Sequence, residues 1–108
     1  MTAPYTTFFA DGEHTFQLTP KLITELETKC GPIGALFNRV NHRAFSQSDL
    51  SETIRIALVG GGMAPKRAAE LVAAYVDGRP IAESYPIASK ILERVWFGAP
   101  NEASNGQA

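Results

Sequence analysis

The chain has 108 residues, of which 44% are hydrophobic and 19% are charged, and its formal net charge is −1. This length predicts one small domain whose core needs neither metals nor disulfides. The composition excludes a wholly disordered chain, and the near-zero charge provides no global attraction to nucleic acid or anionic membranes. Cys30 is the single cysteine and cannot form a disulfide within the chain, which favours a reducing compartment.

Targeting and membrane signals are also lacking. No apolar run approaches the roughly 18 residues of a membrane-spanning helix. The first ten residues lack the basic start and apolar centre of a signal peptide. We therefore expect an intracellular protein that makes no membrane contact, with a domain over residues 1–100 and a disordered, small and polar tail over residues 101–108.

The first expected element is a β-hairpin around Asp11 and Gly12, a pair that favours a tight type I′ turn. A two-residue loop there would place Phe9 opposite His14. Strand alternation points Phe8 to one face and puts four large side chains on the other: Tyr5, Phe9, Phe16 and Leu18. Because a lone hairpin is marginal in water, that second face must pack on the helices that follow.

Five helical segments are expected after the hairpin, because apolar residues recur there at helical spacing. Thr19 and Pro20 are the types of residue that cap and begin a helix, and they open the first segment. The later segments start near these residues: Ile33, Ser46, Pro65 and Pro80. The sequence thus predicts an α+β fold, mostly α, with an N-terminal β-hairpin packed on about five short helices.

Local signals predict several details of these helices. The third helix has three competing N-caps: Ser46, Ser48 and Asp49. Asp49 also has the capping-box spacing with Glu52. Tyr75 falls on the inward stripe of the fourth helix. Pro86 is expected to kink the fifth segment or to restart it, with Ser84 as the new cap.

No catalytic or metal site is expected. Cys30 falls on the apolar stripe of the first helix, which is typical of a buried structural thiol. His14 and His42 have no histidine or cysteine at metal-ligand spacing. Glu25 and Glu27 are two residues apart on a helix, so their carboxylates point in different directions. We therefore expect no enzyme activity, no catalytic residue, no cofactor and no metal.

A run of three glycines separates the third and fourth helices: Gly60, Gly61 and Gly62. Lys66 and Arg67 follow the run, but the order of residues fails the P-loop pattern for phosphate binding. We interpret the glycines as a flexible link and as a candidate hinge for the last two helices. A rival interpretation is a small helix-turn-helix-like DNA-binding regulator that uses Arg55, Lys66 and Arg67, although the loose connection and the low charge disfavour nucleic-acid binding.

Four aromatic residues are candidates for partner binding: Phe8, Tyr85, Trp96 and Phe97. Trp96 and Phe97 are adjacent on the last helix, so their side chains point about 100° apart and a small core has difficulty hiding both. Phe8 could extend the same surface. In the alternative interpretation, Trp96 closes the core and Phe97 caps the helix end beside Gly98.

The order of several short motifs resembles that of a known family. The motifs are Thr15-Phe16-Gln17-Leu18-Thr19, Leu22-Ile23-Thr24-Glu25-Leu26-Glu27, Cys30-Gly31, the helix from Ser48 through Leu58 to the glycine run, Pro86-Ile87-Ala88 to Leu92, and Phe97-Gly98. They resemble, from about Phe8 to Gly98, the small tail proteins of gene transfer agents and related siphophages, which are tail tube or tail assembly chaperone proteins.

The resemblance implies a non-enzymatic role in the morphogenesis of a prophage-like tail or gene transfer particle. It implies a tail assembly chaperone or adaptor that binds the tail tape-measure protein and the tail tube protein, in the cytoplasm of a bacterial host. The alternative is a structural tail tube or terminator subunit, which would be virion-associated. A tube wall usually needs a sizeable β-sandwich, so the short, helical chain favours the chaperone. Homo-oligomer formation stays open.

Overall fold

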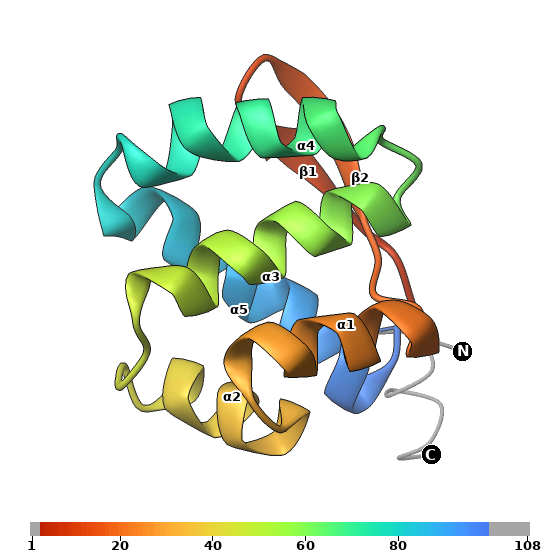
Figure 1. Ribbon diagram of the computed structural model, residues 1–108, viewed down its shortest axis with the longest axis vertical. Coiled ribbons are helices and arrows are strands. Elements are labelled where there is room, and N and C mark those ends of the chain that lie inside the picture. The colour runs from red at the N-terminus through yellow and green to blue at the C-terminus, as the bar shows by residue number, and fades with distance from the viewer. Residues whose placement is uncertain (1–2, 100–108) are drawn as a thin grey trace.

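The computed structural model describes residues 3–99, which form a two-stranded antiparallel sheet, five α-helices and one π-helical turn (Figure 1). The elements in chain order are β1 (Tyr5–Phe9), β2 (Gly12–Phe16), α1 (Pro20–Cys30), α2 (Ile33–Asn41), α3 (Gln47–Gly60), α4 (Pro65–Val72), the π-helical η1 (Ala73–Asp77) and α5 (Ile81–Phe97). The predicted α+β, mostly α fold is confirmed. The predicted tail over residues 101–108 lies outside the described residues.

Helix α3 is the centre of the fold and packs against α1, α4, α5, β2 and η1. In Figure 1 it crosses the middle of the molecule, with α4 on one side and α1 and α2 on the other. Its predicted apolar stripe is buried, and the neighbours on both sides also bury Thr53 and Ile56. The buried side chains of α3 are Asp49, Leu50, Thr53, Ile54, Ile56, Ala57 and Leu58. None of the helices within residues 3–99 is long and apolar enough to cross a membrane.

The hairpin has the predicted faces but a different register. Phe9 pairs with Gly12 rather than with His14, so the turn residues are Ala10 and Asp11. Ala10 takes the positive φ, at 60°. Moving the turn by one residue changes each cross-strand partner by two positions, and an even change keeps every side chain on its face. Phe9 is therefore still buried, as predicted, and Phe8 is still exposed.

The predicted start of α1 is confirmed, and a glycine follows its last residue. The Thr19 hydroxyl accepts a hydrogen bond from the backbone N–H of Leu22 at 3.3 Å, and Pro20 is the first helical residue. Gly31, with a φ of 85°, follows the last residue and donates its N–H to the carbonyl oxygen of Glu27. A threonine cap and a positive-φ glycine thus bound this helix, as local chemistry requires.

The predicted capping box of α3 is wrong in its partners. Ser46 is the N-cap, and its hydroxyl accepts from the N–H of Asp49, while the Asp49 carboxylate accepts from the N–H of Ser46. Glu52 lies one turn further along and instead binds Arg55. Asp49 is therefore the third helical residue of the box and not its first member.

Two predictions for the C-terminal half are also corrected. Tyr75 is 41% exposed rather than inward, because it lies in the π-helical turn, whose wider spacing breaks the helical stripe that follows from α4. The last helix does not restart, since α5 runs continuously through Pro86. Ser84 is not a cap: its hydroxyl donates to the carbonyl oxygen of Ile81 at 3.3 Å, and Pro80 precedes the helix.

Candidate functional site

An aromatic patch, formed by Phe37, Trp96 and Phe97, lies where α2 meets the C-terminal end of α5. The rings of Phe37 and Trp96 stack with centroids 4.7 Å apart, and Phe97 meets Phe37 edge-on at 6.4 Å. Phe37 is partly buried against the core, whereas Trp96 and Phe97 are 57% and 59% exposed. Trp96 therefore does not close the core, and two large rings face solvent in orientations that Phe37 holds.

The end of α5 is fixed from its other side as well. Gly98 ends the helix with a φ of 81° and donates its N–H to the carbonyl oxygen of Arg94. The Arg94 guanidinium lies 5.2 Å from the ring centroid of Tyr5 and donates to the carbonyl oxygen of Pro4 at 3.2 Å. The aromatic patch consequently lies at a helix end that contacts both α2 and β1. Aromatic side chains held in this way are typical anchors of protein interfaces.

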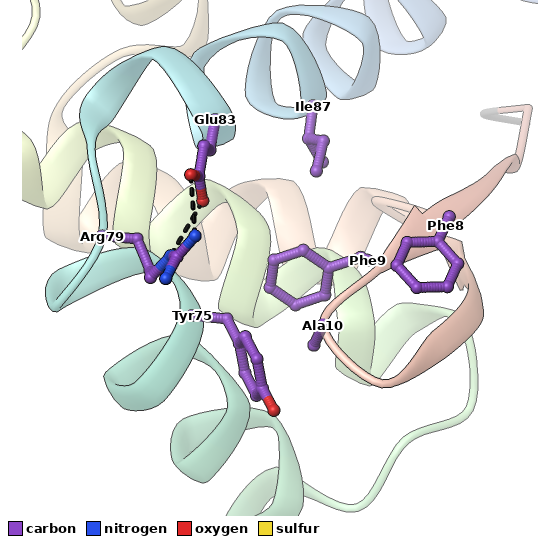
Figure 2. A pocket seen from close by; sticks show the side chains of 7 residues that line it. All are labelled: Phe8, Phe9, Ala10, Tyr75, Arg79, Glu83 and Ile87. Atoms are coloured by element: carbon purple, nitrogen blue, oxygen red, sulfur yellow. Dashed lines mark hydrogen bonds and ion pairs between the residues drawn. The ribbon is translucent and has the colours of Figure 1, made fainter.

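Phe8 lies elsewhere, beside a pocket of about 380 Å³ that Figure 2 shows. The pocket lies between the hairpin turn, the π-helical turn and the first half of α5, and is lined by Phe8, Phe9, Ala10, Tyr75, Arg79, Glu83 and Ile87. Phe8 itself is 71% exposed. Because Trp96 and Phe97 occupy the opposite end of α5, Phe8 does not extend the aromatic patch.

One wall of this pocket carries a paired charge. Arg79 binds the Glu83 carboxylate through two hydrogen bonds, of 3.0 and 2.9 Å. These bonds hold the pKa of Glu83 below its ordinary value and raise that of Arg79. Tyr75 meets the ring of Phe9 edge-on, with centroids 6.4 Å apart. The pocket therefore offers apolar surface and a charge pair that is already satisfied.

Tyr85, the fourth aromatic candidate, is engaged within the chain. Its hydroxyl donates to the carbonyl oxygen of Val40 at 3.1 Å, and its ring stacks on Phe45 with centroids 5.3 Å apart. The Arg43 guanidinium lies 5.8 Å from the ring centroid. Tyr85 thus secures the connection between α2 and α3 and does not join the aromatic patch. A partner-binding role for these candidates stays a prediction.

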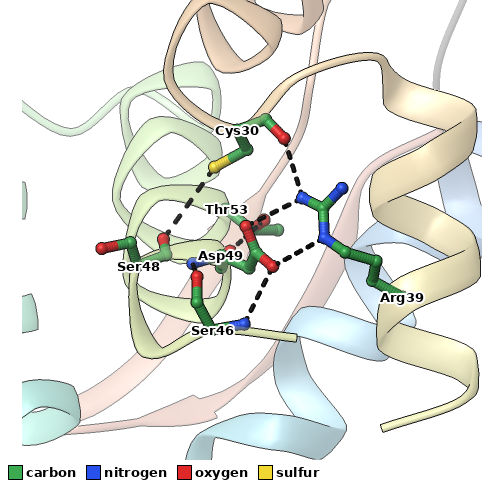
Figure 3. A network of polar contacts seen from close by, with 6 residues as sticks. All are labelled: Cys30, Arg39, Ser46, Ser48, Asp49 and Thr53. Carbon is green, nitrogen blue, oxygen red and sulfur yellow. Dashed lines mark hydrogen bonds and ion pairs between the residues drawn. The ribbon is translucent and has the colours of Figure 1, made fainter. Parts of the chain in front are cut away.

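A polar network missed by the sequence reasoning joins α1, α2 and α3 (Figure 3). Arg39 donates Nε to Oδ2 and Nη2 to Oδ1 of Asp49, both at 3.0 Å, and Nη2 also donates to the carbonyl oxygen of Cys30 at 2.7 Å. Burial raises the pKa of Asp49, but hydrogen bonds from Arg39 and the Ser46 backbone outweigh it, so the net pKa is lowered. Thr53 donates its hydroxyl to the carbonyl oxygen of Asp49 at 2.6 Å. The network is a structural junction.

Cys30 borders this network and is partly buried. Burial, and then the nearby Asp49 carboxylate, raise the pKa of its thiol to about 11. A nucleophilic cysteine needs a lowered pKa, so the environment of Cys30 suits a structural thiol. Among residues 3–99, no three histidine, cysteine, aspartate or glutamate side chains lie together as a metal site would require.

The glycine run has a role that the hinge interpretation did not anticipate. A Cβ added to Gly60 would clash with the carbonyl oxygen of Gln17, and one added to Gly61 would clash with that of Thr15. The N–H of Gln17 also donates to the carbonyl oxygen of Ala57 at 3.0 Å. The end of α3 thus lies directly against the outer edge of β2. Hinge motion at these glycines stays a prediction.

The basic residues of the rival DNA-binding interpretation are partly neutralised. Arg67 binds Asp11 in the hairpin turn at 2.7 Å, and Arg55 binds Glu52 through bonds of 2.8 and 3.0 Å. Asp11 also meets His14 at 2.8 Å. These pairs reduce the positive charge that α3 and α4 offer for phosphate contacts.

A comparison with protein-family models matched residues 3–98 to the family described as "Phage tail tube protein, GTA-gp10". The chain belongs to this phage tail family. A search of the curated proteins and a search of the solved structures gave no match. The family match confirms the resemblance to tail proteins of phages and gene transfer agents, and it gives the chain a structural or morphogenesis role in such a tail.

The residues of the aromatic patch were only partly predictable from the sequence. The sequence identified Trp96 and Phe97 but not Phe37, because nothing local connects residues so far apart in the chain. Arg39 and Asp49 were missed for the same reason. The prediction for Tyr75 assumes a regular fourth helix, and the π-helical turn Ala73–Asp77 moves this residue off the inward stripe.

Proposed function

We propose that this tail protein acts in assembly, as a non-enzymatic chaperone or adaptor that binds another tail protein through the aromatic patch. The observation that carries the proposal is the exposure of Trp96 and Phe97 while Phe37 holds both rings in place. Exposed rings of fixed orientation lose little conformational freedom on binding, so they favour association. The patch supplies apolar contact area and no charge.

The fold supports a chaperone over a wall subunit. The sheet within residues 3–99 has two strands, and the rest of the ordered chain is mainly helical. A wall built by strands of neighbouring subunits usually needs a larger sheet in each subunit. A small helical domain with an apolar patch instead suits the recognition of an amphipathic helix, whose apolar face lies on such a surface. The tape-measure protein, a long helical protein in tails generally, is the proposed partner.

The second candidate is a structural subunit of the tail tube, and the printed description of the family favours it. The two roles predict different locations at the end of assembly. A chaperone leaves the tail, whereas a tube subunit stays in stoichiometric amount. Mass spectrometry of purified mature particles distinguishes them: presence at the level of the tube protein contradicts the chaperone, and absence contradicts the tube subunit.

Co-expression tests the proposed partner. The full chain carrying an affinity tag is produced with the tape-measure protein, and separately with the tube protein, from the same locus. We expect the tape-measure protein to co-purify at both low and high salt, because an apolar contact is not screened. Retention of neither partner would remove the main support for the proposal.

Matched variants locate the contact. Trp96→Ala and Phe97→Ala should weaken capture of the partner by about tenfold or more, as loss of interface anchors does. Ile81→Ala is the control, since Ile81 is another exposed apolar residue of α5 but lies at its opposite end. Equal loss with the control would show that the partner binds elsewhere.

A further inference from the structure

The outer edge of β1 is the open edge of the hairpin. The outer edge of β2 is covered by α3, because Gly60 and Gly61 lie against the carbonyl oxygens of Gln17 and Thr15. The N–H of Gln17 donates to the carbonyl oxygen of Ala57, also on α3. Within residues 3–99, no backbone hydrogen bond or glycine contact joins another element to the outer edge of β1. Helix α5 contacts the start of the strand, where Arg94 lies over the ring of Tyr5 and donates to the carbonyl oxygen of Pro4.

The register identifies which backbone groups of β1 face outward. The carbonyl oxygen of Thr15 points away from β1, so Thr15 and its partner Thr6 form a pair without mutual backbone hydrogen bonds. Their hydroxyl oxygens lie 3.0 Å apart, as expected for the closer type of pair. By the same alternation, the backbone N–H and C=O groups of Phe8, which pairs with Glu13, also point away from β2. Beyond the hairpin, no backbone hydrogen bond within residues 3–99 engages Thr6 or Phe8.

The residues of the strand itself include none of the types that usually protect an open edge. Its sequence, Tyr5–Phe9, is three aromatic residues and two threonines, without charge, proline or glycine. Exposed edges in soluble proteins are normally blunted by lysine, proline or a bulge. Phe8 adds a 71% exposed ring on the outer face, beside the pocket that separates this end of the strand from Ile87. Such an edge is suited to pairing with another strand.

We propose that β1 pairs antiparallel with β1 of a second copy of this chain, which joins two hairpins into one four-stranded sheet. A two-fold axis at Thr7 would pair Thr6 of each copy with Phe8 of the other through their outward N–H and C=O groups. The two Phe8 rings would then be diagonal neighbours on the outer face, within reach of aromatic side chains.

The charge distribution of the chain favours a second copy as the partner of this edge. An uncharged strand can pair with itself without placing like charges opposite one another. The charges beside the pocket, Arg79 and Glu83, already bind each other. The net charge of −1 gives two copies little mutual repulsion. This interface goes beyond the proposed function and does not use the aromatic patch.

Two lysine substitutions test the interface by sedimentation velocity over a concentration series of the full chain. We expect the wild type to change from monomer to dimer, and Phe8→Lys to weaken the dimer by about tenfold or more, because each lysine would lie diagonally across from its copy. Glu13 lies opposite position 8 and can pair with that lysine, so the hairpin should still fold. Phe97→Lys is the matched control: it changes an equally large exposed ring outside β1 and should leave the dimer intact.

Amide hydrogen exchange of the wild type gives a second measurement. The N–H groups of Thr6 and Phe8 should exchange quickly in dilute samples and become protected as the concentration rises. The N–H of Thr7 faces β2 and should be protected throughout. A chain that is monomeric at every concentration, or a dimer lost in Phe97→Lys but kept in Phe8→Lys, would overturn the proposal. A monomeric chain leaves the capture experiment with the tape-measure protein unaffected, whereas a dimer lost only in Phe97→Lys would place self-association on the aromatic patch.

Discussion

The Arg39 guanidinium binds the carboxylate of Asp49 through a bidentate pair of hydrogen bonds, with both donor–acceptor distances at 3.0 Å. The Asp49 side chain is 7% exposed, so its charge depends on this partner and on the Ser46 backbone. The same guanidinium reaches the last carbonyl oxygen of α1, on Cys30. One arginine on α2 therefore fixes the end of α1 and the start of α3, the helix on which the core is built.

Removing that guanidinium should destabilise the fold. Arg39→Ala leaves a nearly buried carboxylate without its main partner, and we expect the free energy of unfolding to fall by about 2 kcal/mol. Arg79→Ala is the control, because the ion pair of Arg79 with Glu83 is half exposed on both sides, so solvent screens it and its loss should have little effect on stability. Urea denaturation measures both. Equal losses in the two variants would contradict a special role for Arg39.

The Asp49 carboxylate should also make stability depend on pH. Its pKa in the folded chain is below the ordinary value, although burial alone would raise it. The stabilisation is therefore complete above the unfolded pKa of about 4 and is lost as the pH falls through the folded value. We expect Asp49→Asn to be less stable than the wild type at pH 7, with a smaller difference at pH 2.5.

Urea midpoints of the two proteins across this range give the measurement. The comparison is needed because the pKa values of Asp11, Glu52 and Glu83 are lowered as well, so the wild type has other sources of acid sensitivity. A gap between wild type and Asp49→Asn that stays constant from pH 7 to acid would show that the carboxylate charge is not responsible.

Features of the fold that depend on neighbouring residues in the chain were predictable from the sequence. Thr19 and Gly31 bound α1 through their own backbone and side-chain chemistry, and strand alternation placed Phe9 inward. The hairpin register was not predictable in this way. Registers that differ by two positions bury the same side chains, so contacts distant in sequence must decide between them, such as the ion pair of Arg67 with Asp11.

The candidate site was likewise predictable only where its features have local causes. Adjacent aromatic residues at the end of a helix left open whether Trp96 and Phe97 form a contact surface or close the core, and in the structure both are exposed. That Phe37 stacks beneath them depends on how α2 crosses α5, which no local pattern encodes. Tyr75 was misplaced because a π-helical turn shifts the helical phase.

Cys30 should be a slow nucleophile in the folded chain. Burial and the Asp49 carboxylate raise the pKa of its thiol to about 11, so little thiolate is present at pH 8. We expect alkylation by iodoacetamide to be roughly 100-fold faster after unfolding in urea, where the pKa returns to its ordinary range. Mass spectrometry follows the reaction without ambiguity, because Cys30 is the single cysteine. Equal rates in the folded and unfolded chain would contradict a partly buried thiol beside the Asp49 carboxylate.

Substitution of the glycines at the end of α3 distinguishes two roles for them: allowing α3 to lie close to the backbone of β2, or acting as a hinge. Gly60→Ala and Gly61→Ala would each drive a methyl group into a backbone carbonyl of the segment Thr15–Gln17. Backbone on both sides cannot yield as a side chain can, so we expect each to lower the free energy of unfolding by about 2–4 kcal/mol.

Gly34→Ala is the matched control for this pair. Gly34 lies within α2 with no atom near the position of an added Cβ, so alanine should stabilise the chain by about 0.5–1 kcal/mol through its higher helix propensity. Thermal unfolding of the three variants distinguishes the interpretations. If Gly60→Ala and Gly61→Ala unfold like the wild type but lose partner binding, the glycines act as a hinge. If both lose stability while Gly34→Ala gains it, they are required because α3 ends against the backbone of β2.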